Sequence, residues 1–266
     1  MHLIHIDTTH CVRCNQCVAA CPSRLIVQET PQSYPRRVAD ADERCIACMH
    51  CTAICPVGVI AIDEIDRKMC QPVPKESMPR FEHIATLART RRSIRNYSAK
   101  PVEKAKLEQV LDVVRWAPTA KNGLPVRWVV ANRRELIAEL AGMIVEWMRN
   151  IPECRPAVDA WDRGVDMVTR GAPCLIVAYT EKDALWPAMD ATIAVETLDL
   201  CATAMRLGCC WAGYFILAAQ SDRKIAKRLG LTDSQTVQAA LMLGYPANES
   251  YTRIPWRKEL DIRWLE

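Results

Sequence analysis

The sequence lacks several features that would assign it to a familiar class. No run approaches the 18 apolar residues of a membrane-spanning helix, and the first residues, MHLIHIDTTHCVRC, have neither the basic nor the apolar segment of a secretory signal. Lys and Arg number 35 against 31 Asp and Glu, a surplus too small for the basic face of a nucleic-acid-binding protein. We therefore expect a cytoplasmic protein with no membrane span and no nucleic-acid partner.

The short motifs of several common enzyme classes are also absent. There is no Gly-x-Gly-x-x-Gly, P-loop, His-Glu-x-x-His or Gly-x-Ser-x-Gly, which argues against a Rossmann dinucleotide site, a P-loop nucleotide site, a zinc protease and a serine hydrolase. Half of the 266 residues are hydrophobic and a quarter are charged, a composition typical of folded proteins. The length suggests two domains.

Cysteine, in contrast, is abundant, and eight of the 14 cysteines form two copies of C-x2-C-x2-C-x3-C-P offset by 34 residues. A [4Fe–4S] cluster needs four thiolates, three from one tight loop and a fourth from elsewhere, and this spacing supplies them. Zinc sites usually lack the third close cysteine, and disulfides require an oxidising compartment. We favour iron–sulfur clusters, with metal ligands Cys11, Cys14, Cys17 and Cys21 in the first copy and Cys45, Cys48, Cys51 and Cys55 in the second.

Residues 1–62 resemble the bacterial two-cluster ferredoxins. In those proteins the fourth cysteine of each run binds the other cluster. The resemblance implies one cluster on Cys11, Cys14, Cys17 and Cys55 and another on Cys45, Cys48, Cys51 and Cys21. The six cysteines outside the two motifs have mostly apolar surroundings, and we interpret them as small buried hydrophobic residues.

The rest of the chain is predicted to form a linker and a second domain. Residues 63–80 carry three prolines among charged residues, a pattern typical of a linker. From residue 81 to 266 the pattern alternates, which indicates an α/β layer. Helices are expected at 81–92, 101–116, 133–149, 156–169 and 188–207, and strands at 126–131, 174–179, 209–215 and 237–245. The last twenty residues look like an arm.

Three short segments of the second domain carry candidate chemistry. RRSIRNY at 91–97 gathers three arginines and a serine, which suit an anion, although it could be a solvated helix end. APTAKNGLP at 117–125 is a turn-rich loop, and by itself only a loop. LGCCWAGY at 207–214 has glycines that let backbone amides approach a flat ligand, although it could be a core strand.

In this order, and followed by LGYP at 243–246 and RIPWRK at 253–258, the segments resemble the nitroreductase-like flavoprotein family. The resemblance spans about residues 84–266 and implies an α/β sandwich, a mixed sheet flanked by helices, with FMN at a homodimer interface. The whole chain is therefore expected to be α+β. The implied FMN-binding residues are Arg91, Arg92 and Ser93 near the phosphate and ribityl chain, Arg95 at the pyrimidine edge, Pro118, Thr119 and Asn122 along the isoalloxazine, the amides of Ala212 and Gly213 at N5, and Arg253 and Arg257 at the phosphate. Leu124 stands where the family has a polar glutamine.

The two resemblances together predict an FMN-dependent oxidoreductase fed by its own clusters. Its acceptor would be a nitroaromatic, a quinone, an activated alkene or a related small molecule, and its donor a reduced ferredoxin or NAD(P)H. The alternative is an electron carrier in which FMN is only a relay. A redox sensor is disfavoured because no DNA-binding helix pair is found. No catalytic side chain is assigned; Trp161 and Lys121 could touch substrate, but packing and solvent exposure explain them more simply.

Overall fold

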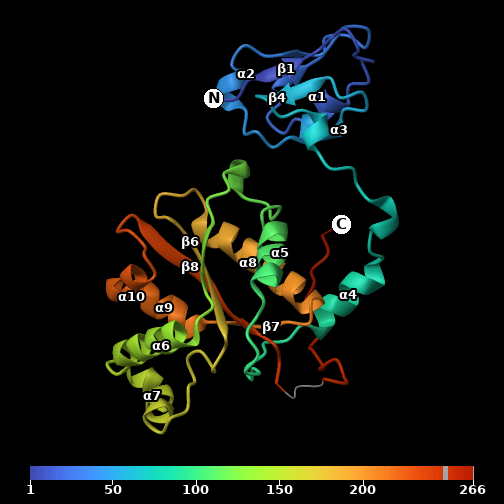
Figure 1. The fold of residues 1–266 in the computed structure, drawn as a ribbon. Helices are drawn as coiled ribbons and strands as arrows, with labels where there is room; N and C mark the ends of the chain where they lie inside the picture. Colours follow the sequence, from blue (N-terminus) through green and yellow to red (C-terminus); the bar gives the residue numbers. More distant parts are fainter. Residues whose placement is uncertain (248–250, 266) are drawn as a thin grey trace. The chain divides into compact units, whose positions relative to one another are not determined.

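The computed structural model describes residues 1–247 and 251–265, and the chain divides into two compact units (Figure 1). Unit 1 comprises Met1–Met78 together with Lys121–Gly123, and unit 2 comprises Pro79–Ala120 and Leu124–Glu266. Each unit has hydrophobic cores of its own. No helix in the described part of the chain is long and apolar enough to span a membrane.

Unit 1 is built from very short elements around a small core. Strand β1 (Ile4–Ile6) pairs antiparallel with β4 (Ile60–Ile62), and β2 (Ile26–Val27) pairs antiparallel with β3 (Arg36–Arg37). Helices α1 (Gln16–Ala20) and α3 (His50–Ile54) each contain the third cysteine of a motif, and α2 (Ala41–Arg44) precedes the second motif. The core is formed by side chains such as Ile4, Leu25, Ile26, Ile60 and Ile62.

The 34-residue repeat of the sequence is also a repeat of the backbone. Helix α3 lies 34 residues after α1, and β4 begins 34 residues after β2. Left-handed backbone conformations, which are costly for most residues, recur at the same interval. The first copy has them at Arg13, Asn15 and Arg24, and the second at Ala47, Met49 and Gly58. The chain therefore follows the same path around each cysteine motif.

The expected linker is not wholly irregular. It contains two single turns of 3-10 helix, η1 (Arg67–Met69) and η2 (Lys75–Ser77). The side chain of Asp66 caps the first by accepting a hydrogen bond from the amide of Lys68 at 2.8 Å. The three prolines keep longer helices from forming here.

Unit 2 contains a four-stranded sheet in the order β5–β6–β8–β7. Its strands are β5 (Arg127–Ala131), β6 (Cys174–Glu181), β7 (Gly208–Trp211) and β8 (Gln235–Gly244), and every neighbouring pair is antiparallel. We expected a mixed sheet; within the described residues, parallel pairing occurs only as an isolated bridge between Ser93 and Cys209. The predicted α+β class is confirmed.

Helices cover both faces of this sheet (Figure 1). Successive residues of β6 alternate between two cores, Leu175 and Val177 in one and Ile176 and Ala178 in the other, as strand geometry requires. Helices α5 (Lys104–Val114) and α8 (Pro187–Ala204) pack on the face of Ile176. The opposite face is covered by α6 (Arg134–Met148), α7 (Arg155–Asp162), α9 (Gly213–Ser221) and α10 (Arg223–Arg228). Helix α4 (Phe81–Thr90) contacts α8.

Two of the elements predicted for unit 2 were wrong in extent, and two helices of this unit, α9 (Gly213–Ser221) and α10 (Arg223–Arg228), were not predicted. The strand expected at 209–215 ends at Trp211, because α9 begins at Gly213. The helix expected at 156–169 ends at Asp162, and Gly164 follows it with a φ of +82°, a conformation that stops a helix. Helices α9 and α10 went unnoticed because α9 is apolar on nearly every side, which hides the helical period.

Candidate functional site

Two small cavities in unit 1 bring the cysteines of the two motifs together. One is lined by Cys11, Cys14 and Cys17 with Cys55 from the second motif. The other is lined by the remaining four, Cys21, Cys45, Cys48 and Cys51. These are the two groupings that the crossed arrangement of two-cluster ferredoxins implies. The cavity walls are otherwise largely apolar, which suits a group that carries its charge on sulfur.

The backbone around these cavities offers hydrogen bonds to sulfur. The amide of Leu25 donates to Sγ of Cys21 at 3.3 Å, and the amide of Val59, 34 residues later, donates to Sγ of Cys55 at 3.4 Å. Burial raises the pKa of the Cys17 and Cys45 thiols and raises that of Cys51 to about 11. Metal binding must therefore displace protons from these thiols.

This donor set fits a four-iron cluster better than a single ion. Within the described residues, no three His, Cys, Asp or Glu side chains converge as one metal ion requires. A four-iron cube instead holds its thiolates at separate corners, and hydrogen bonds to its sulfurs tune its potential. Four cysteines around each cavity, with amides directed at sulfur, match those needs.

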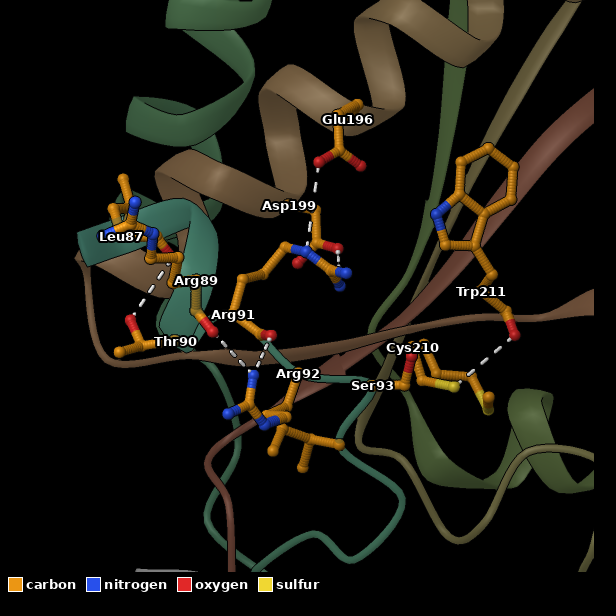
Figure 2. A network of polar contacts seen from close by, with 12 residues as sticks. Leu87, Arg89, Thr90, Arg91, Arg92, Ser93, Glu196, Asp199, Cys210 and Trp211 are labelled. Atoms are coloured by element: carbon orange, nitrogen blue, oxygen red, sulfur yellow. Dashed lines mark hydrogen bonds and ion pairs between the residues drawn. The ribbon is translucent and has the colours of Figure 1, made fainter. Parts of the chain in front are cut away.

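In unit 2, Arg91 directly follows α4 and reaches α8 (Figure 2). Its Nη1 lies 3.0 Å from Oδ2 of Asp199, and its Nε lies 3.9 Å from Oε1 of Glu196. Asp199 is fully buried, and its Oδ1 has no hydrogen-bond partner in the described structure. Burial raises the pKa of Asp199, while the charge of Arg91 opposes this rise. The pair therefore holds the Arg91 side chain against α8.

The neighbouring residues of the 91–97 segment are less constrained. Arg92 donates from Nη1 to the carbonyls of Arg89 and Arg91 at 2.9 and 2.8 Å, as Figure 2 shows. Arg95 is exposed and makes a single long hydrogen bond, 3.4 Å, to the carbonyl of Ser93. The backbone of Ser93 lies beside Cys209 at the start of β7. Two guanidinium groups and a serine are thus gathered next to the edge of the sheet.

At the junction of β7 and α9, the backbone amide of Gly213 is open and that of Ala212 is hydrogen-bonded. The amide of Ala212 donates to the carbonyl of Ala240 at 2.9 Å, so it is engaged in the sheet. Gly213 is exposed, is the first residue of α9, and a Cβ built on it would meet no atom within 4 Å. The first amides of a helix lack intrahelical acceptors and favour anionic or electron-rich atoms. Of the two predicted amides, only that of Gly213 remains open.

The 117–125 loop is held by side chains on both sides. The amide of Ala120 donates to Oδ1 of Asp190 at 3.0 Å, and that of Leu124 donates to Oγ1 of Thr119 at 3.1 Å. Pro118 is exposed and Thr119 is half-buried. Asn122, which belongs to unit 1, donates from Nδ2 to the carbonyls of Ile46 and Ala47 at 3.1 and 3.2 Å. Its side-chain nitrogen is therefore engaged within unit 1, and its place along the isoalloxazine stays a prediction.

The C-terminal arginines lie on an exposed segment without helix or strand. The carbonyl of Arg253 accepts a long hydrogen bond, 3.5 Å, from Nη2 of Arg92, and Tyr251 lies under the Arg92 guanidinium at 5.6 Å from the ring centroid. These contacts bring the backbone of the segment, but not the Arg253 or Arg257 side chains, to the 91–97 segment.

Residues 88–245 match the nitroreductase family, and residues 10–60 match the 4Fe-4S dicluster domain. The first match covers more than half of the chain. The chain belongs to the nitroreductase family. It is accordingly an oxidoreductase of that family with an N-terminal iron–sulfur domain.

Relatives and solved structures agree with this assignment. A protein of Archaeoglobus fulgidus named as a candidate NADH dehydrogenase/NAD(P)H nitroreductase is 25% identical over 175 residues, 64% of this chain and 88% of the relative. A nitroreductase of Bacteroides fragilis with bound FMN has a TM-score of 0.59 at 21% identity and covers 69% of this chain and 98% of its own. An FMN-bound nitroreductase of Desulfitobacterium hafniense has a TM-score of 0.58 at 21% identity, with 69% and 100% covered. These structures show that unit 2 has the nitroreductase fold.

Two buried aspartates of the nitroreductase domain were missed by the sequence reasoning. Asp190 and Asp199 lie on α8, and they are the residues that hold the 117–125 loop and Arg91. The available signal was the helix itself. Residues 188–207 are mostly apolar, and an isolated carboxylate is too costly to bury in such a helix without a partner.

Two cavities of unit 2 could receive a small molecule. One, of about 240 Å³, is lined mainly by apolar side chains including Leu111, Val114 and Trp128, together with Arg115 and with Thr119 of the 117–125 loop. A larger one, of about 350 Å³, lies among α6, α7 and the 164–172 turn and includes Trp161. No predicted flavin residue lines the larger cavity. The smaller one adjoins the predicted site, and we prefer it for that reason.

Proposed function

We propose that this nitroreductase-family protein is an FMN-dependent reductase whose own two [4Fe–4S] clusters supply its electrons. The observation that carries the proposal is the pairing of two four-cysteine cavities with a nitroreductase domain in one chain. When bound, FMN would collect electrons that the clusters carry singly and supply them to a small-molecule acceptor. FMN is present in the structural neighbours from Bacteroides fragilis and Desulfitobacterium hafniense.

The residues present suit FMN. The phosphate would be held at the 91–97 segment by Arg91, Arg92 and Ser93, with Arg95 nearer the ring. Gly213, with its open amide and free space, would face N5 of the flavin. Pro118 and Thr119 would line the ring. Arg253 and Arg257 remain proposed phosphate ligands, and their exposed segment is joined to this site through Arg92.

The cluster ligands are proposed in the crossed arrangement, Cys11, Cys14, Cys17 and Cys55 for one cluster and Cys21, Cys45, Cys48 and Cys51 for the other. The support is the grouping of these cysteines around the two cavities. Each cavity also receives an amide hydrogen bond at the cysteine that comes from the other motif.

The acceptor is proposed to be a nitroaromatic, a quinone, an activated alkene or a related small molecule. The apolar cavity of about 240 Å³ beside Thr119 suits a flat, weakly polar compound. A protein that only relays electrons has no need of such a cavity. The donor is proposed to be a reduced ferredoxin, with NAD(P)H as the competing donor that the names of the relatives suggest.

A homodimer is part of the proposal. The C-terminal segment carries large apolar side chains that are almost fully exposed, among them Trp256, Leu260 and Trp264. Large apolar surface of this kind usually marks an interaction site. Light scattering on the full chain at micromolar concentration should give twice the mass of 30.0 kDa. A monomeric mass would remove the dimer from the proposal.

The proposal is first tested by composition. Protein purified without oxygen should contain about eight irons, about eight sulfides and one FMN per chain, since two four-iron clusters are expected. A flavin-free protein that also fails to take up added FMN would overturn it.

The route of the electrons needs a variant with a damaged cluster. Cys48→Ser removes a proposed ligand, and Cys70→Ser, outside both motifs, is the matched control. We expect Cys48→Ser to slow ferredoxin-driven reduction of a nitroaromatic at least tenfold, and Cys70→Ser to leave the rate unchanged. If NAD(P)H reduces the flavin and supports nitroaromatic turnover at the same rate in both variants, electrons do not enter through the clusters.

A further inference from the structure

Helix α8 contains two buried carboxylates in a mostly apolar sequence. Asp190 is 2% exposed and Asp199 is fully buried. Burying a carboxylate is costly unless a charge or a hydrogen-bond donor compensates it. Asp199 is paired with Arg91 and Asp190 with the amide of Ala120, and both partners belong to segments that the proposed function assigns to FMN. The thiol of Cys209 also acts on Asp199.

The partner of Asp199 is Arg91. Oδ2 of Asp199 accepts a hydrogen bond from Nη1 of Arg91 at 3.0 Å. Oε1 of Glu196 lies 3.9 Å from Nε of the same guanidinium. Nη2 is left without a hydrogen bond to the described residues. A guanidinium that is anchored through one edge keeps its remaining donors in one direction, which lowers the entropy lost when an anion binds.

The partner of Asp190 is the amide of Ala120. Ala120 immediately precedes the strained part of the 117–125 loop. Lys121, Asn122 and Leu124 all have φ between +45° and +54°, and none is a glycine. Such conformations persist only where the surroundings enforce them. The 3.0 Å hydrogen bond from the amide of Ala120 to Oδ1 of Asp190 holds the loop to α8 at Ala120, which belongs to unit 2.

The two aspartates act at different ends of the same helix. They are nine residues apart, which is about 13 Å along an α-helix. A short connection reverses the chain between α8 and β7, so Asp199 lies beside the start of β7, where the thiol of Cys209 acts on its pKa. Asp190 therefore lies toward the other end of β7, which leads to Gly213.

We propose that Asp199 and Asp190 are positioning residues for the two ends of FMN, Asp199 through Arg91 for the phosphate and Asp190 through the 117–125 loop for the isoalloxazine. This inference rests on the proposed function. Neither carboxylate touches the flavin. Each fixes a segment that does, so that α8 acts as the common support of the binding site.

The two ends can be separated by comparing FMN with riboflavin, which has the same ring and no phosphate. The full-length protein, with its clusters in place and its flavin removed, is equilibrated with each flavin without oxygen, and free flavin is measured by fluorescence after ultrafiltration. We expect Asp199→Asn to weaken FMN binding by about 10- to 100-fold, the range for a charge-assisted hydrogen bond. Riboflavin binding should change by less than about threefold.

The other aspartate should give the opposite pattern. Asp190→Ala should weaken FMN and riboflavin alike, by about tenfold, because an acceptor for a buried amide is lost. Asp190→Asn should restore both affinities, since an amide oxygen accepts the same hydrogen bond. Asp199→Asn lacks the negative charge that orients Arg91, so the conservative change should not rescue that position.

Two further variants separate positioning from folding. Asp166→Asn alters a third aspartate of unit 2, which is only partly buried and accepts hydrogen bonds within the 164–172 turn. This variant should leave the ratio of FMN affinity to riboflavin affinity unchanged. Arg91→Ala/Asp199→Ala removes both charges and so avoids an unpaired buried carboxylate. The ratio of FMN affinity to riboflavin affinity in this double variant should equal the ratio in Arg91→Ala alone, because a residue that acts only through Arg91 has no effect once Arg91 is gone.

The inference fails if Asp199→Asn weakens both flavins equally, which is the result of a purely structural role. It also fails if FMN binds more tightly to Asp199→Asn, because Asp199 would then merely neutralise Arg91. If the unaltered protein binds no FMN, the proposed function itself is overturned, so the two failures are distinguishable.

Discussion

The two units assemble their candidate sites in different ways. In unit 1, eight cysteines within 45 residues surround two cavities, and the same backbone turns recur 34 residues apart. In unit 2, the candidate site draws on segments near residues 91, 118 and 213, which are far apart in the chain. A metal site can be encoded by spacing within one loop, whereas a site for an extended organic cofactor depends on how helices and strands pack.

The units also differ in how they are stabilised. Unit 1 has strands of two or three residues and a core of few side chains, and domains of this size usually need a metal or disulfides. Unit 2 has a sheet covered on both faces by large cores. The comparison predicts that iron should matter for folding in one unit only.

Removal of iron should have the largest effect. After chelation without oxygen, we expect residues 1–78 to lose most protection from hydrogen exchange, while β6 and β8 keep theirs, since metal binding supplies folding free energy to a small domain. Mass spectrometry of proteolytic fragments measures both regions in one sample. Equal protection of residues 1–78 before and after chelation would remove the contrast between the units.

Serine variants of the cysteines should sharpen the account of unit 1. Cys21→Ser and Cys45→Ser lie in different motifs but line the same cavity, so each should leave the same single cluster, with about four irons per chain. Cys55→Ser and Cys11→Ser should leave the other one. Electron paramagnetic resonance of the reduced proteins compares the remaining clusters. If Cys21→Ser instead resembles Cys11→Ser, the clusters are not crossed.

Glycine variants should test the packing that builds the site of unit 2. A Cβ on Gly208 would lie 2.6 Å from Cγ1 of Ile94, which belongs to the 91–97 segment. We expect Gly208→Ala to lower the free energy of unfolding by about 1–3 kcal/mol through overpacking. Gly213→Ala, where nothing lies within 4 Å, should change it by less than about 0.5 kcal/mol. Denaturant unfolding of unit 2 measures both, and equal losses would contradict the packing argument.

The smallest effect should come from an exposed carboxylate. A hydrogen bond from the Tyr245 hydroxyl, helped by Lys100, lowers the pKa of Glu103 from 4.5 to about 2. A lowered pKa stabilises the folded state above about pH 4.5, and this contribution is lost as the pH falls toward 2. Glu103→Gln should therefore flatten the fall in melting temperature of unit 2 between pH 4.5 and 2.

Tyr245→Phe provides the check on that prediction, because it removes the donor and keeps the carboxylate. It should flatten the same part of the pH profile. If the melting temperature falls between pH 4.5 and 2 as steeply in both variants as in the unaltered protein, this contact contributes nothing to stability.

Much of the fold was predictable wherever a local pattern was sufficient. The expected strand at 174–179 corresponds to β6 and the expected helix at 133–149 to α6, because their apolar periods are clear. The antiparallel sheet order and helix α9 were not predicted. Sheet order depends on contacts between distant segments, and α9 is apolar all round and so resembles a buried strand.

The candidate flavin site shows the same division residue by residue. Arg91 and Ser93 were recognised by type and spacing, yet their sequence does not reveal that Asp199 holds Arg91. Ala212 and Gly213 are adjacent and looked equivalent, but the sheet occupies the amide of Ala212 and leaves that of Gly213 open. Asn122 was predicted beside a flavin from its place in the loop, and the sequence does not reveal that its side chain donates to the carbonyls of Ile46 and Ala47.

From its residue order alone, the chain specifies the iron–sulfur motifs, the alternation of helices and strands, and the basic and glycine-containing segments of the nitroreductase domain. These are properties of neighbours in the sequence, because thiolate spacing and apolar period act over a few residues. Only packing decided which amide stays free and which buried aspartate holds each segment, whereas the grouping of the cysteines around the two cavities is the one that the ferredoxin resemblance implies. Those outcomes depend on burial and on pairings between residues 70 or more positions apart, and such contacts exist only once the chain has folded.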